Sequence, residues 1–103
     1  MAEAWERIDV LGREMDTFVA SPEGAPKRPG VVVICHAGGV DEFVQEMTRR
    51  LAQAGYVGAS PDLFHLQDSD DRSPLKLRDI DIIQDVRATL AWPHAYDTEH
   101  ANP

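Results

Sequence analysis

Apolar and polar residues alternate loosely along the first twenty residues of the chain. The segments WERIDV (residues 5–10) and REMDTFVA (residues 13–20) both follow this period of two, which is typical of strands with one buried face. The tripeptide Leu-Gly-Arg at residues 11–13 can turn the chain, so we predict a β-hairpin or two edge strands here. Residues 21–30, SPEGAPKRPG, are rich in proline and glycine and predict a loop.

The next segment, VVVIC, does not alternate. It begins at Val31 and ends at Cys35, and it lies between Pro29-Gly30 and the pair Gly38-Gly39. A short, continuous apolar run of this kind predicts a strand that is covered on both faces. Such strands occur mostly in parallel sheets flanked by helices, so the run favours an α/β fold.

A helical period begins after the glycines. Asp41 is positioned as an N-cap, and the acidic residue that follows it suits the positive end of a helix. Gly55 is typical of the residue just past a helix C-terminus. The apolar stripe between them is predicted to consist of Phe43, Val44, Met47, Leu51 and Ala52. The segment YVGASPDL then predicts a short strand that Pro61 ends, so residues 31–60 predict one strand–helix–strand unit.

A polar segment, FHLQDSDDRSP, follows the second strand. Its three aspartates lack the frame of an EF-hand, which favours a solvated loop. The helical period returns at Leu77 and ends at Trp92, which a proline follows. Its apolar stripe is predicted to consist of Ile80, Ile83, Val86 and Leu90, with Ile82 beside it. Residues 93–103 are polar and patternless, so we expect a poorly ordered tail.

Composition and charge narrow the class of protein. The 103 residues are 43% hydrophobic and 27% charged, as is usual for one small globular domain. A formal net charge of -8 repels phosphate backbones and anionic lipid, which argues against nucleic acid and membranes as partners. The single cysteine fits a reducing compartment, and the polar N-terminus does not resemble a signal peptide. The apolar runs are too short to span a bilayer, so we expect a cytoplasmic protein.

The pentapeptide HAGGV lies where the predicted strand meets the predicted helix. A helix N-terminus leaves backbone N–H groups without partners, and glycines allow a ligand oxygen to approach closely. The turn is therefore suited to bind an anion or an oxyanion, while glycines also occur at such places simply to make the turn. It is neither a Walker loop nor a dinucleotide fingerprint, because the sequence has neither spacing.

In their order and spacing, the segments RPGVVVI, HAGGV and TRRLAQAGYVGASPDLF resemble the dienelactone hydrolase family, across about residues 14–92. The resemblance implies a partial α/β-hydrolase fold: three layers (α-β-α) with N-terminal strands, one βαβ unit and a further helix. It implies hydrolysis of a small-molecule ester or lactone through an acyl-enzyme, and we expect no cofactor. It also places His36, Ala37 and Gly38 at the oxyanion hole, which a backbone N–H of the turn helps to form. Two roles stay open for His36, a substrate-facing imidazole or a residue that only shapes the turn, and we favour the second.

The family's nucleophile lies in a G-x-C-x-G or G-x-S-x-G elbow, and this sequence contains neither motif. Cys35 is not flanked in that way, and we interpret it as a buried thiol. The acid and histidine of the family's triad are not matched in position by Asp62, His65, His94 or His100. We therefore assign no catalytic residue. We expect residues 1–103 to be a single incomplete domain, truncated before the nucleophile strand and inactive alone.

Two other interpretations are open. A non-catalytic interaction module would pair with another chain through the 31–35 strand, which becomes a sheet edge when its neighbour is missing. An apolar edge of this kind also predicts self-association. A metal site would use Cys35, His36, Asp62 and His65, which lie near the ends of the two predicted strands. Structural zinc sites usually show tighter paired spacing, so we assign no metal.

Overall fold

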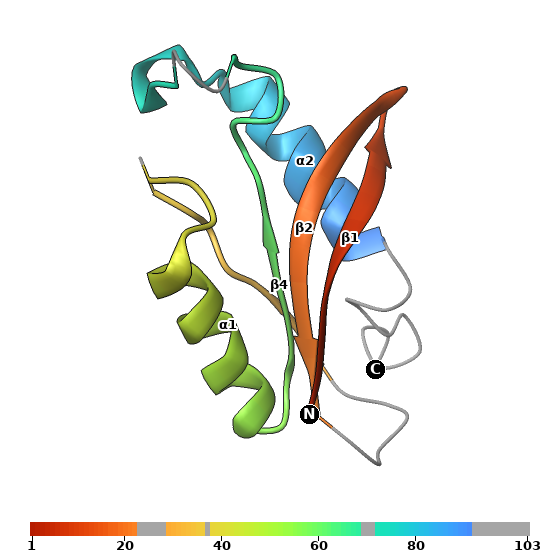
Figure 1. Cartoon of the computed structure of the whole chain (residues 1–103). Helices are drawn as coiled ribbons and strands as arrows, with labels where there is room; N and C mark the ends of the chain where they lie inside the picture. The colour runs from red at the N-terminus through yellow and green to blue at the C-terminus, as the bar shows by residue number, and fades with distance from the viewer. Residues whose placement is uncertain (23–28, 37, 69–71, 92–103) are drawn as a thin grey trace.

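Residues 1–22, 29–36, 38–68 and 72–91 are described by the computed structural model, and in these ranges two helices pack on a four-stranded sheet (Figure 1). The strands are β1 (Ala2–Val10), β2 (Arg13–Ser21), β3 (Gly30–Val32) and β4 (Val57–Pro61); the helices are α1 (Glu42–Gln53) and α2 (Asp79–Ala91), with a short 3-10 helix at Pro74–Lys76. The strand order is β1-β2-β4-β3, with β3 parallel to β4 and the other neighbours antiparallel.

The helices α1 and α2 lie on opposite sides of the sheet (Figure 1). α1 contacts β2 and β4, whereas α2 contacts β1, β3 and β4. This arrangement confirms the predicted α/β class with three layers. The predicted tail, residues 93–103, lies outside the described residues. In the described part of the chain, no helix is both long enough and apolar enough to cross a bilayer.

β1 and β2 form the predicted hairpin. Val10 pairs with Arg13, so the connection consists of Leu11 and Gly12 alone. Their φ angles of 51° and 87° are those of a tight turn whose twist matches that of paired strands. Residues 17–20 of β2 are all buried, so β2 is covered on both faces.

The predicted strand–helix–strand unit is formed by β3, α1 and β4. Val31 lies opposite Gly58 in a parallel pair, as a helical crossover requires. The side chain of Asp41 caps α1, because its Oδ1 accepts a hydrogen bond from the Val44 N–H at 3.0 Å. Gly55 follows the helix with a φ of 102°, a left-handed conformation that favours glycine.

The buried row of α1 consists of Val44, Thr48 and Ala52, each four residues from the next. The Thr48 hydroxyl donates a hydrogen bond to the Val44 carbonyl at 2.8 Å, which satisfies this buried polar group within the helix. The prediction that Phe43 belongs to the buried stripe is wrong. Its side chain is 61% exposed, because it lies one step around the helix from the buried row.

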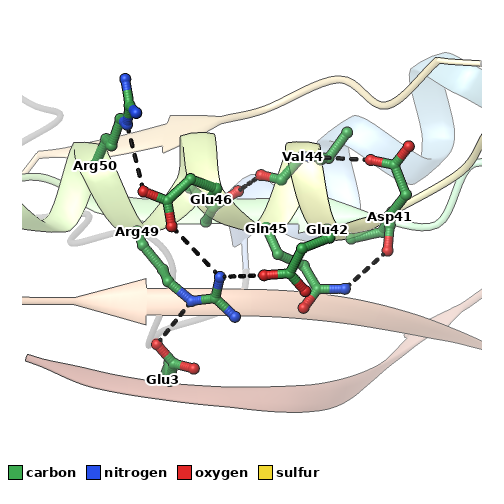
Figure 2. A network of polar contacts seen from close by, with 10 residues as sticks. Glu3, Asp41, Glu42, Val44, Gln45, Glu46, Arg49 and Arg50 are labelled. Carbon is green, nitrogen blue, oxygen red and sulfur yellow. Dashed lines mark hydrogen bonds and ion pairs between the residues drawn. The ribbon is translucent and has the colours of Figure 1, made fainter.

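Arg49 anchors α1 to the N-terminal hairpin (Figure 2). Its Nη1 donates to Glu42 at 2.9 Å and its Nε donates to Glu3 of β1 at 3.0 Å, and these two bonds raise the pKa of the guanidinium. The guanidinium carbon also lies 5.3 Å from the centre of the Phe18 ring in β2. One side chain of the helix therefore contacts both strands of the hairpin.

The prediction that the 31–35 run is a strand covered on both faces is wrong in length and in burial. β3 comprises only Gly30–Val32, and β4 is its one strand neighbour within the described residues. The residues of β3 are half-buried and Ile34 is 54% exposed, whereas Cys35 is buried. The reason is the strand order, since no described strand covers the outer side of β3. The edge position itself agrees with the expectation for a chain that lacks the neighbouring strand.

The predicted apolar stripe of α2 is not the buried face of that helix. Ile80 and Ile83 are 47% and 45% exposed, whereas Asp85 and Thr89 are buried. Ala88, on the buried side, packs against the apolar cluster of the β1–β2 hairpin. Helix α2 therefore does not turn its most apolar side toward the sheet. It turns Asp85 inward instead, where Asp85 forms a buried hydrogen bond with His65.

Candidate functional site

The chain turns sharply between β3 and α1, at the sequence HAGG. The Gly39 N–H donates to the His36 carbonyl at 2.8 Å, which closes the turn. Gly39 has a φ of 71°, and a Cβ added there would lie 3.0 Å from Nη1 of Arg72. A Cβ added at Gly38 would lie 2.9 Å from Oδ2 of Asp41. The positive φ therefore favours glycine at position 39, and a side chain at position 38 would displace the carboxylate of Asp41.

His36 uses both ring nitrogens within the turn. Its Nδ1 accepts a hydrogen bond from the Gly38 N–H at 3.2 Å, so the proton of the neutral ring is on Nε2. Nε2 lies 3.5 Å from Oδ2 of Asp41, whose other oxygen caps α1. These contacts are those of a residue that shapes the turn. The side chain is also 54% exposed, and its ring centre lies 6.1 Å from that of the exposed Phe43.

Three residues were predicted to form the oxyanion hole: His36, Ala37 and Gly38. The structure describes two of them, His36 and Gly38. Ala37 lies outside the described residues. The Gly38 N–H is engaged by the His36 ring, and the Gly39 N–H is engaged by the His36 carbonyl. A substrate oxygen would have to replace the imidazole as the acceptor of the Gly38 N–H. The assignment of these three residues to an oxyanion hole stays a prediction.

Cys35, the residue before the turn, is part of the core. It packs in a cluster with Val44, Leu63 and Phe64. Burial raises the pKa of its thiol, and a hydrogen bond with the backbone of Leu63 opposes this rise. The thiol is therefore protonated at pH 7 and is a poor nucleophile. The interpretation of Cys35 as a buried thiol is confirmed.

Asp62 and Arg72 brace the loop that follows β4. Oδ1 of Asp62 accepts the Phe64 N–H at 3.0 Å, and Oδ2 lies 3.3 Å from Nη2 of Arg72. The Arg72 guanidinium lies over the Phe64 ring, 5.9 Å from its centre, and borders the backbone of Gly39. A cation is thus held next to the turn, where it favours a negative charge. Arg72 was not predicted from the sequence, because no local pattern relates it to the turn.

His65 and Asp85 form a buried pair that joins the loop after β4 to α2. Nε2 of His65 lies 2.9 Å from Oδ1 of Asp85, and the two side chains are only 5% and 3% exposed. Burial raises the pKa of Asp85, and the hydrogen bond with His65 opposes the rise. Nδ1 of His65 is buried and has no hydrogen-bond partner in the described structure. The pair accounts for the rotation of α2, because it turns Asp85 inward.

One feature of the sequence points to this pair, but the isoleucines of α2 led us to predict a different buried face for the helix. Asp85 lies in the middle of a helix, three residues after Ile82 and four before Thr89. An aspartate on that side of a helix needs a buried partner. The sequence does not identify His65 as that partner, since twenty residues separate the two.

The side chains considered for a metal site do not converge. Asp62 pairs with Arg72, and His65 pairs with Asp85. In the ranges that the structure covers, no three His, Cys, Asp or Glu side chains are grouped so that they could hold a metal ion. The other histidines considered in the sequence, at positions 94 and 100, lie outside the described residues.

The sequence and the fold of this chain both match those of known proteins. Residues 15–97 match the sequence model of the dienelactone hydrolase family. The chain is 31% identical over 105 residues to the Yersinia pestis protein named "Putative carboxymethylenebutenolidase", in a match that covers 89% of this chain and 39% of that protein. It also superimposes with a TM-score of 0.76, at 25% identity, on the crystal structure of the "Putative Dienelactone Hydrolase" from Klebsiella pneumoniae, covering 94% of this chain and 47% of that one.

The chain thus spans less than half the length of these two relatives. The family match covers most of its residues, and the α/β fold agrees with that of the Klebsiella structure. The chain therefore belongs to the dienelactone hydrolase family.

Proposed function

We propose that the chain contributes to the hydrolysis of a small carboxylic ester or lactone, as one part of a dienelactone hydrolase-like enzyme. The observation that carries the proposal is the turn between β3 and α1. It presents two glycines at the N-terminus of a capped helix, and the cation of Arg72 borders it. Family membership supports the reaction type, and the short share of each relative that is matched supports a larger enzyme.

In the proposed reaction, a thiolate or alkoxide that this chain does not supply attacks the carbonyl carbon of the substrate. The carbonyl oxygen takes up the negative charge and replaces the His36 imidazole as the acceptor of the Gly38 N–H. This backbone N–H then stabilises the oxyanion by about 3 kcal/mol. The bond between the carbonyl carbon and the leaving oxygen then breaks, and that oxygen takes the proton that a general base removed from the nucleophile, a base that this chain does not supply. Water hydrolyses the acyl-enzyme, which releases the carboxylic acid and restores the nucleophile.

We propose that these 103 residues are inactive alone. The sequence contains no nucleophile elbow. Cys35 is buried and protonated, and His65 is engaged by Asp85. We also propose a cytoplasmic location, which the single cysteine supports.

The test compares the hydrolysis of p-nitrophenyl acetate by the 103-residue chain and by a version extended along its reading frame through a G-x-C-x-G or G-x-S-x-G elbow. We expect background rates from the first and saturable turnover from the second. In the extended version, Gly39→Ala should lower kcat by about tenfold or more, because it displaces the turn. Leu75→Ala is the matched control, since Leu75 is 95% exposed and lies outside the turn. Saturable turnover by the 103-residue chain, abolished by changing one of its own side chains, would contradict the proposal.

The alternative function is a non-catalytic interaction module. One observation favours it, the position of β3 at the edge of the sheet. This alternative predicts no turnover from the extended version either, so the same assay separates the two functions.

A further inference from the structure

The buried pair of His65 and Asp85 has no part in the proposed reaction. Its side chains are only 5% and 3% exposed, and Nε2 of His65 lies 2.9 Å from Oδ1 of Asp85. Nδ1 of His65 is buried as well, and within the ranges that the structure covers it has no hydrogen-bond partner. Apolar residues of similar volume would avoid the cost of burying these groups. A hydrogen bond, however, fixes the distance and the direction between the two elements that it joins. The pair is therefore suited to place the loop after β4 relative to α2.

The His65 end of the pair belongs to a tightly bonded segment, residues 62–65, that follows β4. The His65 N–H donates to the Asp62 carbonyl at 3.2 Å, and the Phe64 N–H donates to Oδ1 of Asp62 at 3.0 Å. The Asp62 N–H donates to the Asp16 carbonyl of β2 at 2.9 Å. The segment is thus attached to the sheet by its first residue and to α2 by the imidazole of its last.

The same segment supports the guanidinium of Arg72. Oδ2 of Asp62 lies 3.3 Å from Nη2 of Arg72, and the guanidinium carbon lies 5.9 Å from the centre of the Phe64 ring. A Cβ added at Gly39 would lie 3.0 Å from Nη1, so the cation borders the turn. The Arg72 side chain is 35% exposed. A long side chain with that much freedom keeps one position only while its supporting groups stay fixed.

Gln67 fastens the backbone beside Arg72 to the same loop. Its side-chain oxygen accepts the Ser73 N–H at 2.8 Å, and its side-chain nitrogen donates to the Ser73 carbonyl at 3.1 Å. The Gln67 N–H in turn donates to the Phe64 carbonyl at 2.9 Å. A displacement of residues 62–65 would therefore move both the side-chain and the main-chain supports of Arg72.

We propose that His65 and Asp85 are positioning residues, which fix residues 62–65 against α2 and thereby hold the Arg72 cation beside the turn. Their importance for catalysis rests on the proposed function, in which a negative charge develops at this turn. A cation stabilises such a charge most when its position is fixed before the reaction. Both residues of the pair are buried, so they act through Arg72 and not by contact with a substrate.

The spectroscopic test uses the 103-residue chain. The Phe64 ring lies against the guanidinium, so the side-chain protons of Arg72 should show a ring-current shift in NMR spectra. Asp85→Ala breaks the pair and should remove most of that shift. His65→Gln should retain it, because the glutamine nitrogen can take the place of Nε2 as the donor to Asp85. A shift that persists unchanged in Asp85→Ala would overturn the proposal.

The kinetic test measures the hydrolysis of p-nitrophenyl acetate by the extended version. Arg72→Met and Asp85→Ala should each lower kcat by about tenfold and change KM little, because the cation acts on charge that develops in the transition state. Asp85→Ala should cause no further loss in the Arg72→Met background, since both changes remove the same placed cation. Losses that multiply to about a hundredfold in the double variant would contradict the proposal.

Ile8→Val is the matched control for a purely structural role. Ile8 lies in the buried cluster of the hairpin that packs against Ala88 of α2, so the change loosens that packing without touching the pair. It should lower Tm and leave kcat unchanged, and a loss of kcat equal to that of Asp85→Ala would overturn the proposal. The NMR readout needs no turnover. An extended version that fails to hydrolyse esters would therefore refute the proposed function, and an unchanged ring-current shift would refute the positioning role.

Discussion

Gly58 in β4 lies in close contact with α1, and a methyl group there is predicted to destabilise the folded chain. A Cβ added at Gly58 would lie 2.9 Å from the Thr48 carbonyl oxygen and 2.9 Å from Thr48 Cγ2. The methyl group of Thr48 could move by side-chain rotation, but the carbonyl is part of the helix backbone. Gly58→Ala therefore forces α1 away from the sheet.

The size of this effect follows from two opposing terms. Overpacking of a well-filled core costs about 1–3 kcal/mol. Alanine is less flexible than glycine in the unfolded chain, so the substitution also stabilises the folded state by about 0.5–1 kcal/mol. We therefore expect Gly58→Ala to lower the free energy of unfolding by about 1–2 kcal/mol. For a domain of this size, the corresponding fall in Tm is roughly 5–15 °C.

Thermal unfolding followed by circular dichroism measures this change. Thr48→Ser removes Cγ2 and keeps the hydroxyl that donates to the Val44 carbonyl, so it relieves one of the two close contacts. The double variant Gly58→Ala/Thr48→Ser is compared with Thr48→Ser alone. The loss of stability between these two should be smaller than the loss caused by Gly58→Ala in the wild type, but it should not vanish. A Gly58→Ala variant that unfolds at or above the wild-type Tm would refute the reasoning. Full recovery in the double variant would show that the carbonyl contact is unimportant.

Three further predictions concern single side chains around the turn and in α2. Asp41→Ala should destabilise the chain by about 1 kcal/mol, because the Val44 N–H loses its cap, and denaturant midpoints should show a smaller loss for Asp41→Asn. Cys35 should react with iodoacetamide at pH 7 more slowly in the folded chain than in urea, because burial raises its pKa, and equal rates would contradict this. Burial also raises the pKa of Asp85, so the folded state holds that proton more tightly than the unfolded state does. Wild-type stability relative to Asp85→Asn should therefore fall as pH rises above about 4, and a pH-independent difference would argue against it.

The candidate site was predictable only where its contacts are local. The glycines of the turn and the Asp41 cap lie within a few residues of one another, so the sequence pattern places them correctly. Of the two roles that the sequence leaves open for His36, we favour that of shaping the turn, and its ring contacts Gly38 and Asp41 nearby. Arg72 and the buried pair of α2 were missed, because each reaches its partner across a loop or between layers. Local periodicity carries no information about such distant partners.

The sequence alone determined the elements whose signals are short-range. Alternation and the tripeptide Leu-Gly-Arg predicted the hairpin of β1 and β2, the apolar run predicted β3, and the change of period after the glycines predicted α1, which YVGASPDL continues into β4. Tertiary structure alone decided that β2 is covered on both faces and that α2 buries Asp85 instead of Ile80 and Ile83. The physical reason is that periodicity shows which residues share a face of a helix or strand. Which face becomes buried depends on strand order and on polar partners such as His65, and long-range contacts decide both.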